Sequence, residues 1–592
     1  MRLAKAATSP LARLSLHGER PSLALPLAAG ALALGAAALS PVQAKEQKTR
    51  QQVFAWGRAQ AHPGGSSSDV LWPRRVEWFE ENPHGWKKVA FGPDFGAALD
   101  KRGQLFVWGA GPVAGSFIGP LKVDVQGDGR GQGLEDVQLS SKKMFALTRR
   151  GDALVFEGFV EELLKRGAPA AEAAEAAAAA KEADEEARPA LEAAAAEAAR
   201  RAAEASKASK QPLRLTAQAV PGLPRAGLLG SLWGYKGRVK SMSIGLEHGC
   251  FVTRHGQLYC VGGNEWGQCA VQPPKQRGPS GALDERTHSE VEFPVLVEFP
   301  PKTPKIVSVQ VGGRHTVAQD AKGNCHAFGD DRRIQLGLGD TRSGGNDERH
   351  AYGVLHQDAL GGKKVKGDIP RAVTYRYYDP HLQSKPVKQV PPLAVNRPEY
   401  PPASAITCGE DFTVGVFRDS PDWYAESQTT NVIFACGENG IGQCGRSMAQ
   451  QQQAWGQVRL PKHSYVESVT CGQAHCLALM RDGQVFSWGG NPQGQVGNGK
   501  RALVQRPVRV TQQPKLPEEL SHLADPNRPA TVTPADIYKQ VAYQHVASRM
   551  SNDLSQTDAP PMPVPVDLPG RVVSLACGFR SSAVICEVPD AA

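Results

Sequence analysis

The sequence predicts an all-β protein, a seven-bladed β-propeller, and three observations support this prediction. The composition is typical of many short strands and turns, with 62 glycines, 45 prolines and 7% aromatic residues in a chain of 592. A short strand ending in a small residue recurs seven times along the chain. A second recurring strand accompanies it as often, so one large ring of repeats can replace several separate domains.

The repeat is clearest between residues 466 and 497. Residues 466–472 alternate apolar and polar like a strand, and 475–479 follow after a short turn as the antiparallel partner. Asp482-Gly483 marks a tight turn into a third strand that ends in Trp488-Gly489. The glycine-rich stretch 490–497 then completes a four-stranded unit.

The third strand of this unit recurs along the chain, and two further copies keep the Trp-Gly ending at Trp56-Gly57 and Trp108-Gly109. The seven copies are 53–57, 105–109, 154–158, 258–262, 325–329, 433–437 and 485–489. The first strand of the unit ends at residues 92, 140, 245, 312, 409, 472 and 578. Four-stranded units bury their apolar faces by stacking around an axis, which predicts seven blades.

The two ends of the chain complement one another. The chain begins with a third strand and ends with an inner pair at 572–578 and 582–586. We therefore expect the first and last segments to complete one blade together, which removes the free edges of an open ring.

The WG, GxxxHxxAL-like and GNxxGQxG-like pieces, clearest from Cys471 to Gly497, resemble the repeat of the regulator of chromosome condensation family. The resemblance covers residues 51–588, with insertions at about 159–236, 271–304, 341–402 and 511–569. It implies a protein-binding propeller, because the founding member is an exchange factor for a small GTPase.

Three histidines, His248, His315 and His475, occupy the same place in different repeats, where Phe95 and Phe412 stand in two others. Equivalent positions in separate blades do not converge on one ion. We therefore predict a structural role, with each imidazole satisfied inside its own blade.

No residue pattern indicates catalysis, a cofactor or a metal site. The eleven cysteines include no CxxC pair, and the chain has no GxSxG elbow or HExxH helix. The glycine-rich turns lead from strand to strand, whereas a phosphate cradle needs a helix after the glycines. The sequence predicts a binding protein, not an enzyme.

The N-terminus predicts a mitochondrial address. Residues 1–20 hold four basic residues and one acidic residue, like a presequence, and 21–44 carry no charge. The apolar run within 21–44 spans about 17 residues, the lower limit for a membrane span, so it is a single transmembrane helix or a cleaved sorting signal. We expect the mitochondrial inner membrane, with the propeller in the matrix because the cysteines are unpaired.

Two insertions favour helices. The Ala- and Glu-rich part of 159–236 predicts a solvated arm, with a docking helix as the alternative. A helix is predicted over 534–549, with Thr533 as its N-cap. This second helix packs on the propeller or meets a partner.

The insertion 341–402 mixes basic and aromatic residues, which suits a protein or RNA contact. The alternative is a long proline-rich surface loop. The candidate partner contacts are Lys363, Lys364, Lys366, Arg371, Tyr375, Arg376, Tyr377 and Tyr378.

Presequence, apolar run and insertion-rich propeller together resemble a smaller group of mitochondrial family members, of which a fungal one is an inner-membrane protein required for assembly of respiratory complex III. The resemblance implies a non-enzymatic platform for protein clients that assists assembly of a respiratory complex, with complex III favoured. Two alternatives stay open: a guanine nucleotide exchange factor for a small GTPase, or a ribosome-associated factor that contacts ribosomal RNA.

Overall fold

The computed structural model describes residues 49–589 apart from several internal gaps. The gaps are 113–115, 183–191, 202–210, 225–237, 271–289, 300–302, 331–332, 338–392, 395–402, 419–430, 447–454, 462–464 and 516–563. Chain contacts separate Met1–Gln47 from Lys48–Ala592, and all the described residues lie in the second unit. The predicted presequence, the apolar run 21–44 and the predicted helix 534–549 lie outside the described residues. Within the described part, no helix has the length and apolarity needed to cross a membrane.

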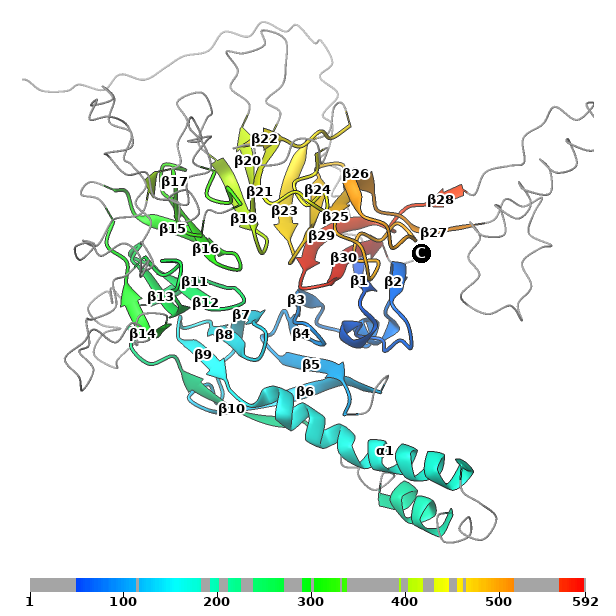
Figure 1. Ribbon diagram of the computed structural model, residues 1–592. Helices are drawn as coiled ribbons and strands as arrows, with labels where there is room; N and C mark the ends of the chain where they lie inside the picture. The colour runs from blue at the N-terminus through cyan, green and yellow to red at the C-terminus, as the bar shows by residue number, and fades with distance from the viewer. Residues whose placement is uncertain are drawn as a thin grey trace, which may run out of the picture. The chain divides into compact units, whose positions relative to one another are not determined.

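The described strands form seven four-stranded blades and one short additional pair (Figure 1). From the axis outward, blade 1 is β29 (Arg571–Cys577), β30 (Ser581–Pro589), β1 (Thr49–Gly57) and β2 (Val70–Arg75). Blade 2 is β3 (Trp86–Phe91), β4 (Phe95–Asp100), β5 (Leu105–Ala110) and β6 (Phe117–Gly127). Blade 3 is β7 (Leu134–Leu139), β8 (Met144–Thr148), β9 (Ala153–Phe156) and β10 (Leu213–Ala219).

The remaining blades follow in chain order. Blade 4 is β11 (Val239–Ile244), β12 (His248–Thr253), β13 (Leu258–Gly263) and β14 (Glu290–Leu296). Blade 5 is β15 (Ile306–Val311), β16 (His315–Asp320), β17 (Cys325–Gly329) and β18 (Leu393–Ala394). Blade 6 is β19 (Ala403–Cys408), β20 (Phe412–Arg418), β21 (Asn431–Gly437) and β22 (Gly456–Gln457). Blade 7 is β23 (Val466–Cys471), β24 (His475–Met480), β25 (Val485–Gly489) and β26 (Val504–Arg509), and β27 (Gln512–Lys515) pairs with β28 (Val564–Val566).

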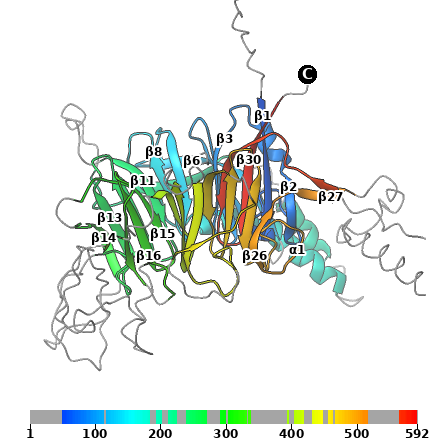
Figure 2. The ribbon, with the colours of Figure 1, turned by 90° about the horizontal axis from the view of Figure 1, so that it is seen from above.

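The seven innermost strands contact one another in sequence and close a ring. β3 contacts β7, and the series continues through β11, β15, β19 and β23 to β29, which contacts β3 again. Figure 2 shows the sheets standing side by side around this axis. The predicted seven-bladed propeller is confirmed, and the recurrent strands predicted from the sequence are the third strands of the blades.

Blade 1 joins the two ends of the propeller, as predicted. β1 pairs with β30 along its whole length, from Thr49 opposite Pro589 to Gly57 opposite Ser581. β30 in turn pairs with the innermost strand β29. Nine residue pairs of backbone therefore close the ring.

The insertions supply outer strands, which the sequence did not predict. β10 lies within 159–236 and pairs in parallel with β6 of blade 2, from Leu213 opposite Val123 to Ala217 opposite Gly127. Blades 2 and 3 consequently form one eight-stranded sheet. β14, β18 and the pair β27–β28 lie within the other three insertions.

Helix α1 (Phe159–Glu182) begins where β9 ends, and its first turn docks on the propeller. Phe159 and Leu163 are buried in a cluster with Phe95 and Ile118, and the Phe95 and Phe159 rings meet edge to face at 4.9 Å. Two apolar residues four apart give this turn one buried face, whereas the predicted solvated arm is the Ala- and Glu-rich part that follows it.

The propeller has two opposite faces, since successive strands of a blade run in opposite directions. We call one the loop face; it carries the turns between innermost and second strands and the connections that leave the third strands. We call the other the turn face; it carries the tight turns 101–104, 149–152, 254–257, 321–324 and 481–484, which join second and third strands.

Candidate functional site

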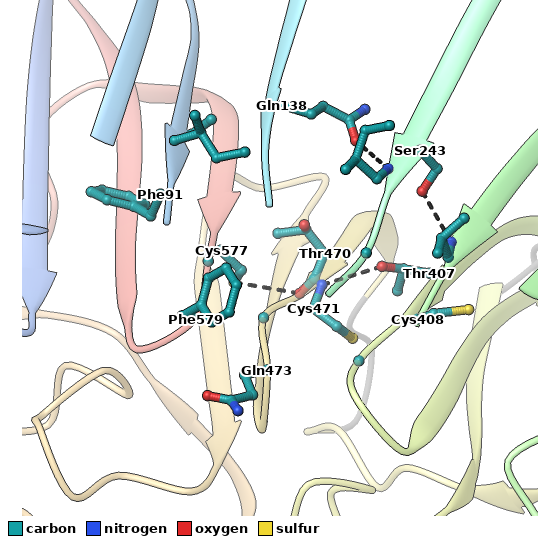
Figure 3. A pocket seen from close by; sticks show the side chains of 18 of the residues that line it. Phe91, Gln138, Ser243, Thr407, Cys408, Thr470, Cys471, Gln473, Cys577 and Phe579 are labelled. Atoms are coloured by element: carbon teal, nitrogen blue, oxygen red, sulfur yellow. Dashed lines mark hydrogen bonds between the residues drawn. The ribbon is translucent and has the colours of Figure 1, made fainter. Parts of the chain in front are cut away.

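A cavity of about 310 Å³ lies on the axis and is lined by the innermost strands of all seven blades (Figure 3). Phe91 and Phe579 line its apolar side. Cys408, Cys471 and Cys577 line it from blades 6, 7 and 1. Burial raises the pKa of the Cys408 and Cys577 thiols, so these side chains pack as small apolar groups.

The polar side chains around the axis bond to backbone of the neighbouring blade (Figure 3). Gln138 of blade 3 donates to the Met242 carbonyl at 2.7 Å and accepts from the Ile244 N–H at 2.9 Å. Ser243 accepts from the Val311 N–H at 3.0 Å, and Thr407 accepts from the Cys471 N–H at 3.2 Å. These hydrogen bonds join neighbouring blades, so the side chains that form them have a structural role.

The repeated tryptophans also reach across blade interfaces. The indole N–H of Trp56 donates to the Gln495 carbonyl at 2.8 Å, from blade 1 to blade 7. Trp488 donates to the Gln443 carbonyl at 3.0 Å, and Trp108 to the Ala61 carbonyl at 2.8 Å. All three rings are almost fully buried.

The glycine after each tryptophan has a packing reason. Gly57 and Gly489 have φ of 107° and 110°, which favours glycine. A Cβ at Gly57 would collide with the Arg580 carbonyl oxygen, and one at Gly489 with that of Ala474. A Cβ at Gly109 would lie 2.8 Å from Cβ of Phe95.

Each of the three repeated histidines bonds to a hydroxyl of the next blade, so the prediction that its partner lies in its own blade is wrong. His248 Nε2 lies 2.7 Å from Oγ1 of Thr316, and His315 Nε2 lies 2.9 Å from Oγ1 of Thr413. His475 Nε2 lies 2.8 Å from Oγ of Ser582. Each imidazole is buried, and a hydroxyl of the neighbouring blade supplies the hydrogen-bond partner that a buried polar group needs.

The hydroxyls fix the direction of these bonds. Ser582 donates its own proton to the Gln495 carbonyl at 2.9 Å, and Thr316 donates to the Gln268 carbonyl at the same distance. A hydroxyl has one proton, so it accepts from the histidine, which carries its proton on Nε2. Burial lowers the pKa of His248 and of His475 to about 3, and that of His315 to about 4. The three rings are therefore neutral at physiological pH.

Aligning the repeats shows a pattern that sequence reasoning missed. Wherever a blade begins its second strand with histidine, the next blade has Thr or Ser one position further along its own second strand. Where Phe412 replaces histidine, the next blade has Cys476 at that position. The pattern becomes visible only when the second strand of one repeat is compared with the second strand of the next repeat.

The loop face carries a mixed charged and apolar surface over blades 4 to 6. Arg314 pairs with Glu247 at 3.4 Å, and its guanidinium lies 6.0 Å from the ring centroid of Trp266. Arg333 pairs with Glu438 at 2.9 Å, and Ile441, three residues after Glu438 in the chain, is 39% exposed. We call Glu247, Trp266, Arg314, Arg333, Glu410, Asp411, Glu438 and Ile441 the loop-face patch.

Asp411 adds a destabilised carboxylate to the loop-face patch. Burial raises the pKa of its carboxyl, and the neighbouring Glu410 and Asp330 raise it further, whereas Arg314 and Arg333 oppose this. A cationic group of a partner placed here would relieve this repulsion.

The predicted partner contacts from Lys363 to Tyr378 lie outside the described residues. Among the residues that the structure describes, no group of three or more His, Cys, Asp or Glu side chains is placed to hold a metal ion.

Fold and axial architecture define the chain as a closed propeller of tandem repeats. Its repeats match the regulator of chromosome condensation (RCC1) repeat, in one family model at residues 239–268 and 466–495 and in a second at 255–319 and 482–521. The chain therefore contains repeats of this type, as its sequence motifs indicated.

Curated relatives match parts of the chain. The human probable E3 ubiquitin-protein ligase HERC6 is 36% identical over 72 residues, which is 12% of this chain and 7% of the relative. The ultraviolet-B receptor UVR8 of Arabidopsis thaliana is 24% identical over 217 residues, 35% of this chain and 46% of the receptor. The chain thus covers less than half the length of either relative.

Solved structures resemble the whole ring. Prp20p of Saccharomyces cerevisiae, whose structure was reported with its binding to Gsp1p and histones, matches with a TM-score of 0.51 at 12% identity over 92% of both chains. Yeast RCC1 (Prp20) bound to Kap60 matches with a TM-score of 0.52 at 12% identity over 92% of this chain and 90% of that one. At this identity the likeness shows the fold.

Proposed function

We propose that this protein is a non-enzymatic propeller that binds protein partners through the loop-face patch. The single observation that carries the proposal is the composition of the patch: a half-buried tryptophan under an arginine, an exposed isoleucine, and carboxyls in excess of cations. Aromatic, aliphatic and arginine side chains together are typical of the centres of protein interfaces. The excess of carboxyls favours a partner with a basic surface.

The solved relatives support a protein-binding role. The structure of Prp20p was reported with its binding to Gsp1p and histones, and another shows it with Kap60. The hydrogen-bonded side chains of the axial cavity join neighbouring blades and so have a structural role.

The finer proposal places the protein at the mitochondrial inner membrane, with the propeller in the matrix, where it assists assembly of a respiratory complex, complex III in preference. The presequence-like residues 1–20 and the uncharged 21–44 support the address. None of the eleven cysteines forms a disulfide, which suits a reducing compartment.

Native-gel profiles of the respiratory complexes in cells lacking the protein test this proposal, with mitochondrial translation labelled in parallel. We expect loss of complex III with translation intact, and restoration by the wild-type chain. A chain carrying Glu410→Lys and Ile441→Asp should fold and fail to restore it. A general translation defect, or full rescue by this variant, would overturn the proposal.

A nucleotide exchange role is the second candidate, favoured by the fold likeness to Prp20p and by the acidic loop-face patch. Release of labelled GDP from candidate mitochondrial GTPases, with wild-type protein and with the Glu410→Lys and Ile441→Asp variant, tests it. If the wild-type protein accelerates GDP release and the variant does not, nucleotide exchange and not complex assembly is the function of this surface.

A further inference from the structure

The turn face carries exposed cations at the tips of its tight turns. Every described turn on this face has Lys or Arg in its first two positions, because the tip residues between the strand end and the turn glycine point to solvent. The exposed cations are Lys101, Arg102, Arg149, Arg150, Arg254, Lys322 and Arg481. Repetition alone does not make a site, but two cavities lie beside part of this series.

The first cavity, of about 610 Å³, combines aromatic rings with cations. Its wall includes the half-buried rings of Trp78 and Phe106, whose centroids are 5.4 Å apart, together with the exposed Arg102 and Lys122. Trp86, which also lines the cavity, packs against Trp78 and Phe106 at 5.1 and 5.2 Å, is buried, and donates its indole N–H to the Phe79 carbonyl at 2.6 Å. The rings therefore form a rigid platform with one side on the cavity.

The second cavity, of about 700 Å³, lies between blades 3 and 4 and is lined by Arg149, Lys240 and Arg254. Its one lining carboxylate, Glu135, forms an ion pair with Lys87. Three cations thus face one carboxylate that is already paired, which leaves the cavity positive.

The side chain of Arg149 joins the two cavities. It lines the second cavity, and a Cβ built on Gly133, which lines the first, would lie 3.3 Å from its Cδ. Its guanidinium also donates to the Lys101 carbonyl at 3.0 Å, which fixes it between the blade 2 and blade 3 turns. We call the two cavities with Arg149 the turn-face groove.

We propose that the turn-face groove binds single-stranded nucleic acid. Phosphates would lie along Arg102, Lys122, Arg149, Lys240 and Arg254, and a base would stack on Trp78 or Phe106. Of the carboxylates in the first cavity, Asp100 accepts from the Gln104 N–H and Glu81 is exposed at the rim. An anionic lipid surface would use the cations alone, whereas the aromatic platform needs a ligand with flat faces. The proposal concerns the face opposite the loop-face patch and does not rest on the proposed function.

Fluorescence anisotropy of the full chain with a labelled twelve-residue oligouridylate tests the proposal. Five cations and single-strand counterion release predict that affinity falls about 100-fold between 50 and 200 mM salt. Lys240→Glu with Arg254→Glu should weaken binding about tenfold. Lys322→Glu with Arg481→Glu is the matched control, because it reverses the same number of charges on the same face, outside the groove, and should change affinity less than about twofold.

The role of the aromatic platform is tested separately. Trp78→Leu keeps an apolar side chain in the cluster and should weaken oligouridylate binding about tenfold, with no effect on an abasic oligomer of equal length. An oligodeoxythymidylate that binds equally supports the proposal and identifies the site as indifferent to the sugar. Equal binding of abasic and normal oligomers, equal loss in both charge-reversal variants, or displacement by phosphatidylserine vesicles at matched charge would overturn it. A thermal midpoint close to wild type identifies variants that fold.

Discussion

Two blade interfaces hold the ring by different means. Between blades 7 and 1, which we call the closing interface because blade 1 joins the two ends of the propeller, side chains cross the gap: the Gln495 carbonyl accepts both Trp56 Nε1 and Ser582 Oγ, and Ser582 accepts from His475. Between blades 2 and 3, backbone joins the outer strands β6 and β10 in a parallel pair. The closing interface depends on buried polar side chains, and the β6–β10 interface depends on the ladder of an inserted segment.

This difference has a consequence for stability. A buried imidazole bonded to a hydroxyl must stay neutral, whereas a backbone ladder does not titrate. Interfaces 4–5 and 5–6 share the histidine arrangement through His248 and His315. The propeller therefore has three acid-sensitive interfaces and one joined through its outer edge by backbone.

Acidification should give the largest effect. The unfolded state binds protons below pH 6.5, but His248, His315 and His475 have folded pKa values of about 3 to 4, so stability is complete above pH 6.5 and declines as the pH falls toward those values. At pH 5 the lowered pKa of each histidine reduces the free energy of unfolding by about 2 kcal/mol. The buried His62, with a pKa lowered to about 4, adds to the same trend.

Urea unfolding at pH 7.5, 6 and 5 measures this decline, and hydrogen exchange locates it. After correction for the slower intrinsic exchange at low pH, amides of β24 and β30 should lose protection at pH 5, with β6 and β10 least affected. Equal loss of protection in all four strands would show that the histidine bridges do not set the order of opening.

Truncation of the closing tryptophan should come next. Trp56 is 1% exposed, so Trp56→Ala leaves a cavity and should cost about 3–5 kcal/mol in urea unfolding. Trp56→Phe keeps most of the ring volume and loses the bond to Gln495, for about 1–2 kcal/mol. Equal costs for the two variants would assign the whole effect to the hydrogen bond.

The sequence alone predicted the blade count, the third strands and the pairing of the chain ends, because each depends on short motifs in constant order. It did not predict the partners of the histidines, since Thr316, Thr413 and Ser582 lie 68 or more residues away in the next repeat. Alignment of successive repeats would have revealed them.

Neither the β6–β10 pair nor the two sites could be predicted from the sequence. β10 follows a helix and returns inside an insertion, so no local pattern indicates its parallel partner. The loop-face patch and the turn-face groove assemble single residues from several blades, and neither has a motif. The basic and aromatic run from Lys363 to Tyr378 does form a sequence pattern, but it lies outside the described residues and stays a prediction.

A double-mutant cycle should give a smaller and more specific effect. The 6–7 interface has Phe412 and Cys476 where the closing interface has His475 and Ser582. His475→Phe alone should cost about 2 kcal/mol, because it leaves Ser582 without its donor and enlarges a packed side chain. Adding Ser582→Cys should recover about 1 kcal/mol, since it converts the closing interface to the 6–7 combination. Strict additivity of the two costs would show that the residues act separately.

The ion pair between blades 1 and 2 should give the smallest effect. Arg58 and Asp94 lie 2.7 Å apart, with 26% and 42% of their side chains exposed. Water screens such a pair, so Asp94→Ala should cost less than about 1 kcal/mol, and less still in high salt. His475 is uncharged and makes one bond of similar length, yet its replacement should cost more because both partners are buried. Urea unfolding of the two variants at low and high salt measures this contrast, and an Asp94→Ala cost that equals or exceeds that of His475→Phe would show that charge, not burial, decides how firmly an interface holds.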